Sequence, residues 1–490
     1  MDSTKSQDIF TSENSEIDPN KGRTLQKSLE LEPNENVSKD KELNILLKDD
    51  VSLMNMDIFK ARKYYEEACA VSNAPERFSE VQVFPPNCLS GVNTVDASTL
   101  GKYRELGLKL ISRGDVAVIV LAGGQGTRLG ADYPKGMYNI GLPSGKSLFQ
   151  IQAEKIDKLI EIAKEKFGSG CLPWFIMTSE LTDRPTREYF ERNGYFGLDP
   201  AHVIFFKQRS MPCFSLSGEI LLESRDRVAR SPDGHGGLYH ALGATGILDT
   251  MHTRGIKHIH VYCVDNILVK VGDPTFLGYC VEQGAHCGVK VVEKITPGES
   301  LGVLCNVDGK HKIVEYSELG NCSVFETQDQ TGRLKFNLGS ICNHYFSLEC
   351  LQRMVKEDAA LKFHMARKKI PCLDEQGISQ RPNKPNGIKL EKFLFDAFPL
   401  CENLVAWEVT RDEFSPLKNS PLDSASDNPV TCCQAVHALH ARWIETAGGV
   451  VVADETGNTV CEIAPRVSYE GEGLEERVKG KVLQTPLLLE

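Results

Sequence analysis

The chain has 490 residues, of which 41% are hydrophobic and 25% charged, which is typical of a globular protein with two or three domains. Its formal net charge of −11 argues against a nucleic-acid-binding scaffold, because such a protein needs a broad basic surface. No run of about 18 apolar residues is present, and the polar N-terminus does not resemble a secretory signal. We therefore expect a cytoplasmic protein that binds neither nucleic acid nor a membrane.

The sixteen cysteines are scattered along the chain, and several lie inside apolar runs. No CxxC pair or other zinc-ligand spacing occurs, so we expect buried free thiols rather than a disulfide framework or a zinc site. His437 and His440 lie three residues apart on a predicted helix, but no third ligand is near them in the sequence. We interpret them as part of a partly exposed helix face.

The pattern changes along the N-terminal part of the chain. Residues 1–40 contain a single aromatic side chain and are rich in polar residues, so they are predicted to be a disordered tail. Residues 41–110 are predicted to be an N-terminal helical region, because apolar residues recur at helical spacing before and after a proline-containing stretch. That stretch, residues 75–100, is interpreted as a linker crossing the surface.

Residues 111–400 are predicted to form a central domain. The run DVAVIVLA is typical of a strand buried on both faces, and the strong helical pattern FQIQAEKIDKLIEIAKEKFG follows it. Further strand patterns occur at LPWFIMTS, VIFFK and HIHVYCVD. This alternation predicts an α/β fold with a mostly parallel sheet that binds ligands at the carboxyl ends of its strands. Residues 401–490 are richer in turns and are predicted to be a smaller C-terminal domain.

The most informative segment, LAGGQGTRLGADYPK, spans Leu121–Lys135 directly after the first central strand. Its glycines let the backbone approach a ligand and turn N–H groups toward phosphate oxygens, and Arg128 adds a planar cationic donor. A dinucleotide fingerprint would need glycine where Leu129 stands, and a Walker A motif would need glycine in place of Ile140. The loop therefore predicts a phosphate site, but not that of a hydride-transfer enzyme or a P-loop ATPase.

This loop, extended as LAGGQGTRLG…YPKGMY…GLPS, resembles the signature of the UDP-N-acetylhexosamine pyrophosphorylases. Other segments are similar to that family in the same order: SPDGHGGLYHAL, HIHVYCVDNILVK, CGVKVVEK, VEYSE, KPNGIKLEKFLFD and DEFSPLKN. The resemblance runs from about Leu46 to the end of the chain. It implies a Rossmann-like nucleotidyltransferase core, with a mostly parallel mixed sheet and smaller N-terminal helical and C-terminal domains. It also implies that a monomer or homodimer joins UTP to N-acetylhexosamine 1-phosphate, giving UDP-N-acetylglucosamine or UDP-N-acetylgalactosamine and pyrophosphate.

The resemblance assigns roles to individual residues. Those expected to bind UTP are Leu121, Ala122, Gly123, Gly124, Lys135, Gln208, Gly234, Asp265 and Lys389. Those expected to bind the sugar phosphate are His235, Glu315, Tyr316, Ser340 and Lys418. Arg128 and Lys135 are the expected catalytic cations, since phosphoryl-type transfer depends mostly on positioning and electrostatics.

A bound metal ion is also implied. Asp265 ends a predicted buried strand, where its carboxylate would hold Mg²⁺ or Mn²⁺ against phosphate oxygens. Without the resemblance, Asp265 would be interpreted as a helix N-cap or turn residue, and Lys389 and Lys418 as solvated surface lysines.

Two positions depart from the family pattern in the part expected to bind the sugar. His235 in PDGHGG and Ser340 in NLGSI stand where the family has asparagine. An amide offers two donors and an acceptor, whereas neutral histidine offers one of each and serine a shorter hydroxyl. Three interpretations stay open: a working enzyme of the family, a uridylyltransferase of altered sugar preference, and a non-catalytic paralogue that binds UTP or a UDP-sugar. We also expect His235 to change charge near pH 6–7, so that the KM for the sugar varies over that range.

Overall fold

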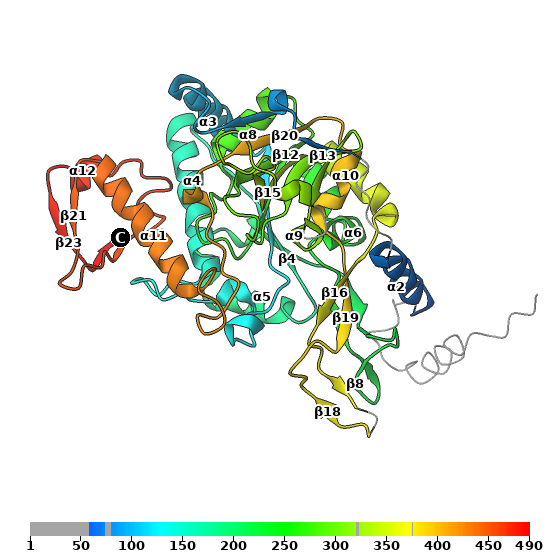
Figure 1. The fold of residues 1–490 in the computed structure, drawn as a ribbon. Coiled ribbons are helices and arrows are strands. Elements are labelled where there is room, and N and C mark those ends of the chain that lie inside the picture. Colours follow the sequence, from blue (N-terminus) through cyan, green and yellow to red (C-terminus); the bar gives the residue numbers. More distant parts are fainter. Residues whose placement is uncertain (1–57, 74–79, 320–322, 375) are drawn as a thin grey trace, which may run out of the picture. The chain divides into compact units, whose positions relative to one another are not determined.

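A computed structural model describes residues 58–73, 80–319, 323–374 and 376–490 (Figure 1). Its main sheet has eleven strands. Their bounds are β1 Val81–Val83, β2 Leu89–Gly91, β3 Val116–Leu121, β4 Trp174–Thr178, β5 Val203–Lys207, β11 His258–Cys263, β12 Cys287–Glu293, β13 Val303–Val307, β14 Lys310–Val314, β15 Leu338–Ser347 and β20 Leu404–Glu408.

The strand order is β2-β20-β12-β15-β11-β3-β4-β5, with β13 pairing β15, β1 and β14 beside this path. The neighbours from β5 to β11 are all parallel, and so are β12, β20 and β2. Strand β15 is antiparallel to both of its path neighbours, β11 and β12. The predicted α/β fold with a mostly parallel mixed sheet is therefore confirmed.

Helices cover both faces of this sheet. One face carries α3 Ala97–Ser112, α4 Leu148–Phe167, α5 Asp183–Arg192 and α8 Pro274–Glu282. The other carries α6 Gly237–Ala244, α7 Ile247–Thr253, α10 Leu348–Glu357 and the 3-10 helix η8 Leu394–Leu400. All six residues of β3 are buried, because alternate side chains pack under the two helical layers.

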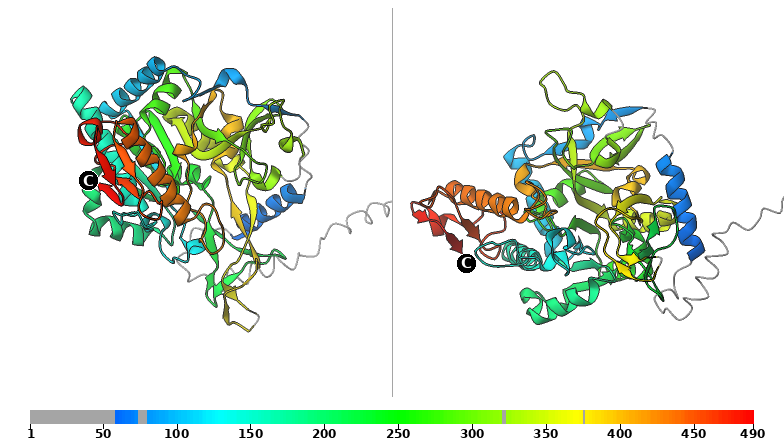
Figure 2. Two further views of the ribbon diagram at one scale, coloured as in Figure 1. Left: turned by 60° about the vertical axis from the view of Figure 1, so that its left-hand side comes forward. Right: turned by 60° about the horizontal axis from the view of Figure 1, so that its bottom comes forward.

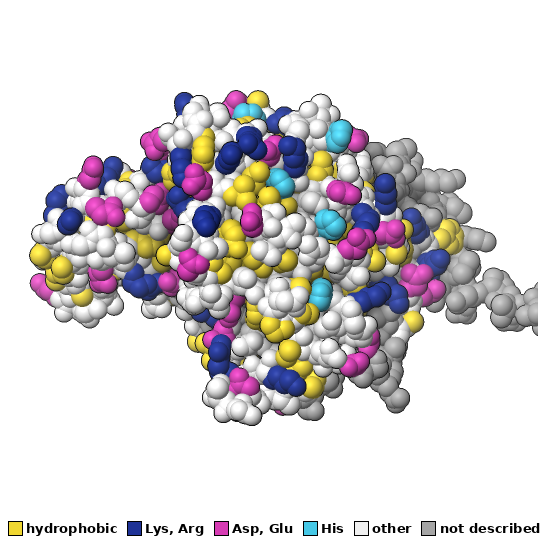
Figure 3. All heavy atoms as spheres, turned by 90° about the horizontal axis from the view of Figure 1, so that it is seen from above, with side chains coloured by type: hydrophobic (Ala, Val, Ile, Leu, Met, Phe, Trp, Pro, Cys, Tyr) yellow, Lys and Arg dark blue, Asp and Glu magenta, His cyan; other side chains and the backbone are white. Residues whose placement is uncertain are grey.

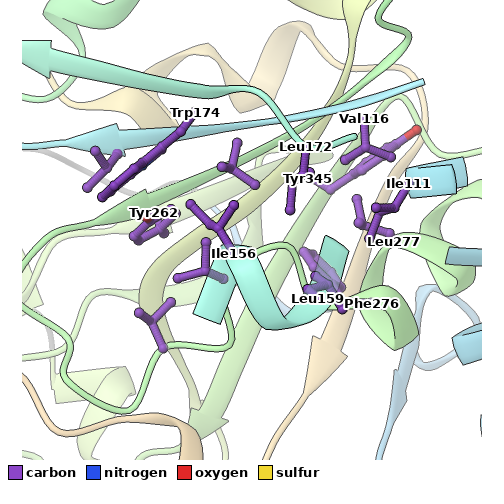
Figure 4. Close-up of a cluster of buried hydrophobic side chains, with 14 of the residues drawn as sticks. Ile111, Val116, Ile156, Leu159, Leu172, Trp174, Tyr262, Phe276, Leu277 and Tyr345 are labelled. Atoms are coloured by element: carbon purple, nitrogen blue, oxygen red, sulfur yellow. The ribbon is translucent and has the colours of Figure 1, made fainter. Parts of the chain in front are cut away.

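The long helix α4 illustrates how the sequence sets an element and its packing. It begins where the Ser147 hydroxyl accepts a hydrogen bond from Gln150 N, and ends at Gly168, whose φ of 82° is left-handed. Its apolar face, including Ile156 and Leu159, packs onto the sheet near Trp174 (Figure 4). The apolar stripe predicted from the sequence is thus the face that packs on the sheet, and burying each such side chain contributes about 1.5–3 kcal/mol.

The N-terminal part differs from the prediction in one respect. Helix α2, Ile58–Asn73, lies in the region predicted to be helical, whereas residues 1–40 and 41–57 lie outside the described residues. The linker prediction for residues 75–100 is wrong for much of its length, because β1 pairs with β13 and β2 with β20. Strands of three residues are too short to show an alternating pattern, and only their distant partners make them strands.

A group of short strands projects below the main sheet in the view of Figure 1. Their bounds are β6 Ser210–Pro212, β7 Phe214–Ser215, β8 Leu222–Ser224, β9 Arg227–Val228, β10 Arg230–Pro232, β16 His364–Lys368, β17 Cys372–Leu373, β18 Ser379–Gln380 and β19 Gly387–Glu391. Strand β19 lies between β16 and β7 in a three-stranded sheet and carries Lys389. The short helix α9, Tyr316–Leu319, follows β14.

The C-terminal part contains α11 Pro429–Thr446, α12 Glu475–Val478, β21 Val450–Val452, β22 Cys461–Ile463, β23 Val482–Gln484 and β24 Leu487–Leu489. Strands β21 and β23 pair in parallel, as do β22 and β24. Helix α11 lies beside α4, and Val436 shares a buried cluster with Leu148 and Ile151 (Figures 1 and 2). The predicted domain boundaries at residues 40, 110 and 400 stay predictions.

The described residues also show how charge is spread over the surface and that the cysteines are unpaired. Acidic and basic side chains are interspersed over the face seen in Figure 3. None of the described helices combines the length and apolarity that a membrane span requires. The fifteen cysteines in the described part of the chain are free thiols, all of them buried or half-buried.

Candidate active site

The glycine loop leaves β3 and is held at both ends. Ala122 N donates to Met177 O at 2.9 Å, which continues the pairing of β3 with β4. Lys135 N donates to Gly124 O at 3.1 Å and so closes the loop. Between them, Arg128 is exposed in the 3-10 helix η2, Thr127–Leu129. A loop fixed at its ends, with an exposed cation between them, is suited to an anionic ligand.

Gln208 follows β5 and lies against this loop. Its Nε2 donates to Gly234 O at 2.9 Å and to Asp233 Oδ1 at 3.2 Å. The other oxygen of that fully buried carboxylate lies 3.0 Å from Arg209 Nε. Because both amide hydrogens are used, Gln208 Oε1 is left as an acceptor, and a Cβ added to Gly123 would be only 2.2 Å from it. The structure thus brings together Gly123, Gln208 and Gly234, as predicted for a uridine site.

Lys135 and Asp265 meet at the neighbouring strand end. Lys135 Nζ lies 3.4 Å from Asp265 Oδ2, and the two side chains are 14% and 21% exposed. Leu417 N donates to Asp265 O at 2.8 Å. Lys418 follows Leu417 directly in the chain, so its backbone lies near this strand end. Strands β3, β5 and β11 are parallel, so the loop, Gln208 and Asp265 share one edge of the sheet.

Asp265 is the carboxylate predicted to hold a metal ion. The described residues contain no group of three or more His, Cys, Asp or Glu that could hold one. Asp265 is partly exposed and lies beside a cation that also suits phosphate. Mg²⁺ is commonly bound through one or two carboxylates and completes its ligand set with phosphate oxygens and water, so Asp265 fits this role.

His235 is packed between aromatic rings. Its ring centroid is 5.4 Å from that of Phe393 and 5.6 Å from that of Phe395, and its Nδ1 accepts a hydrogen bond from Leu394 N at 3.0 Å. Burial lowers the pKa of His235 to about 4, although the nearby Asp396 and Asp265 carboxylates oppose this shift. The prediction that His235 changes charge near pH 6–7 is therefore wrong, because burial disfavours the imidazolium.

Glu315 lies in a cluster of charges. Burial raises the pKa of Glu315 to about 7, and the neighbouring Glu318 adds to this effect while Lys418 and His364 oppose it. His364 Nε2 lies 3.0 Å from Asp396 Oδ2, and its Nδ1 lies 3.6 Å from Glu318 Oε1. Burial opposes protonation of His364, but these two carboxylates raise its pKa to about 10. Lys418 and a charged His364 therefore both act electrostatically on Glu315.

Ser340 and Tyr316 differ in how they are held. Ser340 N donates to Gly302 O at 2.8 Å, and a Cβ on Gly302 would lie 2.9 Å from Glu315 Oε2. Ser340 is therefore separated from Glu315 by one glycine. Tyr316 is 49% exposed, and its hydroxyl makes no hydrogen bond within the part of the chain that the structure describes. The structure connects Ser340 to this part of the site and leaves Tyr316 at its surface.

Three of the predicted cations form no direct side-chain contact with another polar group in the described part of the chain. Among residues 58–73, 80–319, 323–374 and 376–490, the side chains of Arg128, Lys389 and Lys418 form no hydrogen bond or ion pair. Lys389 is thus not joined to the Lys135–Asp265 pair. It lies near Cys213, whose pKa is raised by burial while the lysine charge partly opposes that shift. Cationic side chains without a protein partner are available to an anionic ligand.

Sequence reasoning missed residues that hold the site in place. Ser179 Oγ donates to Gly123 O at 2.7 Å, and Asp233 fixes the Gln208 amide. His364 and Asp396 come from separate elements, and no sequence pattern links the two before the fold is known. Asp233 and Asp396 had a signal, since they lie inside the PDGHGG and KPNGIKLEKFLFD segments, whereas His364 lies in neither.

The model of the protein family described as UTP–glucose-1-phosphate uridylyltransferase matches residues 56–441, which is most of the chain. The chain belongs to this family. Its central domain, with the glycine loop and the Asp265 strand end, lies within the matched residues.

Two relatives and one solved structure show which members of the family the chain resembles. The chain is 46% identical over 441 residues to UDP-N-acetylhexosamine pyrophosphorylase-like protein 1 of Mus musculus, covering 86% of each chain. It is 42% identical over 410 residues to the UDP-N-acetylglucosamine pyrophosphorylase of Saccharomyces cerevisiae, covering 82% of this chain and 84% of the yeast protein. The crystal structure of the uridine diphosphate N-acetylglucosamine pyrophosphorylase from Trypanosoma brucei, in complex with an inhibitor, matches with a TM-score of 0.75 and 31% identity, covering 91% and 90% of the two chains. The resemblance to the UDP-N-acetylhexosamine pyrophosphorylases is confirmed.

Proposed function

We propose that this protein transfers the uridylyl group of UTP to N-acetylglucosamine 1-phosphate, or to N-acetylgalactosamine 1-phosphate, and releases pyrophosphate. The observation that carries the proposal is the shared sheet edge, where the Gly123–Gln208–Gly234 contacts adjoin the Lys135–Asp265 pair. One set suits a uracil and the other a polyphosphate. A cytoplasmic location and a monomeric or homodimeric state belong to the same proposal.

The uridine is held by the loop and by one amide. Gln208 Oε1 accepts a hydrogen bond from the uracil N3–H group, because Gly234 O and Asp233 already use the two amide hydrogens. Backbone groups of residues 121–124 supply the remaining contacts. A base that presents no N–H donor at this position would leave Oε1 buried and unpaired, which disfavours cytosine by about 1–3 kcal/mol.

The transfer forms one bond and breaks one. A phosphate oxygen of the sugar 1-phosphate attacks the α-phosphorus of UTP, and the bond from that phosphorus to the oxygen bridging to the β-phosphate breaks, so pyrophosphate leaves. Arg128 and Lys135 neutralise the charge that develops on the leaving group, and Lys389 contacts the phosphates of UTP. Because the attacking oxygen is already anionic, the residues supply positive charge and alignment rather than a general base.

A divalent cation, Mg²⁺ or Mn²⁺, would be held by Asp265 and would offset phosphate charge when bound. Lys135 is placed to share this task, because its ammonium already lies 3.4 Å from the same carboxylate. Asp265 also keeps Lys135 oriented through that contact, so the two residues position each other.

The sugar phosphate is placed by the other half of the site. Lys418 binds its phosphate, and His235, Glu315, Tyr316 and Ser340 line the sugar pocket. Because His235 is neutral and its Nδ1 accepts from Leu394 N, its Nε2–H is the group left to donate to a sugar oxygen. This single donor in place of an amide favours, as a second candidate, a uridylyltransferase with a broader or altered sugar preference.

One experiment separates the three interpretations. The full chain is incubated with UTP, Mg²⁺ and one of N-acetylglucosamine, N-acetylgalactosamine or glucose 1-phosphate, and pyrophosphate and UDP-sugar are both measured. We expect the highest kcat/KM with an N-acetylhexosamine 1-phosphate. The highest value with glucose 1-phosphate would replace this proposal by the altered preference. UTP binding without turnover of any sugar would overturn both enzyme functions in favour of a non-catalytic paralogue.

Two lysine variants test the placement of the substrates. Lys418→Met is expected to raise the KM for the sugar 1-phosphate by roughly 10- to 100-fold, since a charge-assisted hydrogen bond is lost, while the KM for UTP changes little. Lys389→Met is expected to show the opposite pattern. The exposed Lys481, outside the site, gives the matched control Lys481→Met, which should leave both constants unchanged.

A further inference from the structure

A cavity of about 240 Å³ lies between α4, the segment that follows Asp265, and the C-terminal helix α11. None of the residues assigned to UTP or to the sugar phosphate lines it. Its apolar walls include Ile151, Leu268, Val436, Leu439, Trp443 and Tyr469. The volume is below the range of roughly 300–1,000 Å³ that drug-sized ligands occupy, so it suits a smaller molecule.

Two hydrogen-bond donors in the cavity wall have no acceptor among the residues that the structure describes. The Lys155 ammonium donates to Ile267 O at 3.2 Å and to Val269 O at 2.9 Å, and its third hydrogen has no acceptor among the described residues. His440 Nδ1 accepts from Ile463 N at 2.9 Å. Burial lowers the pKa of His440 to about 3, so the ring is neutral and its proton is on Nε2. That Nε2–H group also has no acceptor within the described part of the chain.

The acidic side chains in the wall are already paired. Glu413 lies 3.3 Å from Lys270 Nζ and 2.5 Å from Lys290 Nζ. Glu470 pairs with Arg104 and Lys270, Asp412 with Arg442, and Glu462 accepts from Ser144 N and Oγ. Lys155 forms no ion pair among the described residues, so its ammonium faces an apolar space without a carboxylate in contact with it.

We propose that this cavity binds a small organic carboxylate with an apolar body. The carboxylate accepts hydrogen bonds from Lys155 Nζ and His440 Nε2, and the body packs among Leu268, Val436 and Leu439. Ile267 and Leu268 follow Asp265 closely in the chain, so the bound molecule contacts the segment that carries the proposed metal ligand. The site does not depend on the transferase function, since it is tested by binding alone.

Protonation of Lys155 gives this site a pH dependence. Burial lowers the pKa of Lys155 to about 7, Lys270 adds to the shift and Glu413 opposes it. The charged or titratable groups around the ammonium are Lys270, Asp412, Glu413, His440, Glu462 and Glu470. Only the ammonium form attracts a carboxylate, and it is lost as the pH rises through about 7. The affinity should therefore fall roughly tenfold between about pH 6 and about pH 8.

Titration calorimetry on the full chain tests the proposal with 3-phenylpropionate as the probe. We expect a Kd that is roughly millimolar or tighter at about pH 6, and one that is about tenfold weaker at about pH 8. The neutral analogue 3-phenylpropionamide should bind at least tenfold more weakly and show no pH dependence. Absence of binding by the acid, or equal binding of acid and amide, would overturn the proposal.

Variants locate the bound molecule. Lys155→Met keeps the length of the side chain and removes the charge, so the Kd for 3-phenylpropionate should rise roughly 10- to 100-fold. Lys164→Met, on an exposed position of the same helix, is the matched control and should bind like the parent. Leu439→Trp fills the cavity from α11 and should abolish binding even if Lys155→Met does not fold. Unchanged affinity in a folded Lys155→Met or Leu439→Trp protein would refute the site.

Discussion

Adding one methyl group at Gly123 tests whether Gln208 recognises the uracil. A Cβ at position 123 would lie 2.2 Å from Gln208 Oε1 and 3.2 Å from Cδ, whereas Ser179 Cβ, at 3.5 Å, is at ordinary contact distance. In the Gly123→Ala protein the amide must therefore move. It cannot do so freely, because it is buried and its Nε2 is bonded to Gly234 O and Asp233 Oδ1.

The structure sets the expected magnitude. Moving the amide removes the acceptor for the uracil, which costs about 1–3 kcal/mol of UTP binding, or a Kd roughly 10- to 100-fold higher. Gly234 O then keeps only the hydrogen bond from Gly237 N at 3.1 Å, and Asp233 keeps Arg209 as a partner at 3.0 Å. Because both acceptors keep a donor, the free energy of unfolding should fall by only about 0.5–1.5 kcal/mol, the net contribution of one hydrogen bond.

A thermodynamic cycle measured by titration calorimetry with UTP isolates the effect. In a Gln208→Ala background no amide opposes the methyl group, so Gly123→Ala should cost less than about 0.5 kcal/mol of further binding energy. Gly101→Ala, where a Cβ meets nothing within 4 Å, is the matched control and should bind UTP normally. Additive costs of the two site changes would show that Gly123 and Gln208 act independently, and would refute this account of the uridine site.

Three further predictions concern charge and the sugar pocket. Arg128→Ala should lower kcat by roughly 10²–10³, measured as pyrophosphate release, and a change confined to KM would make Arg128 a binding contact instead. Restoring the family amides with His235→Asn and Ser340→Asn should raise kcat/KM for an N-acetylhexosamine 1-phosphate by roughly tenfold. In the parent, titration of His235 should not affect the KM for the sugar between about pH 6 and pH 8, because the pKa of His235 is about 4. Glu315→Gln should raise the free energy of unfolding by about 1–3 kcal/mol near pH 8 but not near pH 5. The pKa of Glu315 is about 7 in the folded protein, above its unfolded value, so the parent loses stability as the pH rises toward 7. Equal gains in stability at both pH values would contradict this assignment.

The elements that the sequence predicted well are those whose pattern is local and long. The six buried residues of β3 and the twenty of α4 carry their own periodicity and caps, and both are present near the predicted bounds. The three-residue strands β1 and β2 lie in the stretch interpreted as a linker, because pairing with β13 and β20 decides their conformation and leaves no local signal. Periodicity thus predicted the layers but not the strands added at the edge of the sheet.

The residues of the candidate site also differ in whether a local sequence pattern could reveal them. Gly123 and Lys135 belong to one contiguous motif found in the sequence, and the structure places them beside Gln208 and Asp265. His364 and Asp396 set the charge around Glu315, yet they come from distant segments and only the fold places them together. The prediction that His235 changes charge near pH 6–7 was wrong for a related reason. The sequence shows which side chain can titrate, whereas burial decides whether its pKa lies near neutral pH.

The two departures from the family pattern bear on the sugar in different ways. His235 Nδ1 accepts from Leu394 N, a hydrogen bond that an asparagine oxygen could also accept, so the backbone of η8 stays anchored despite the substitution. What changes is the outer edge of the residue, where a single Nε2–H on a rigid ring replaces a flexible NH₂ group. Ser340, by contrast, is anchored through its backbone to Gly302 and simply has a shorter side chain. A longer or bulkier sugar substituent could use the space beside Ser340, whereas His235 limits the geometry of the donor. Under the proposed function the two substitutions act on substrate preference. Arg128, Lys389 and Lys418, whose side chains form no hydrogen bond or ion pair in the described part of the chain, are available to the phosphates.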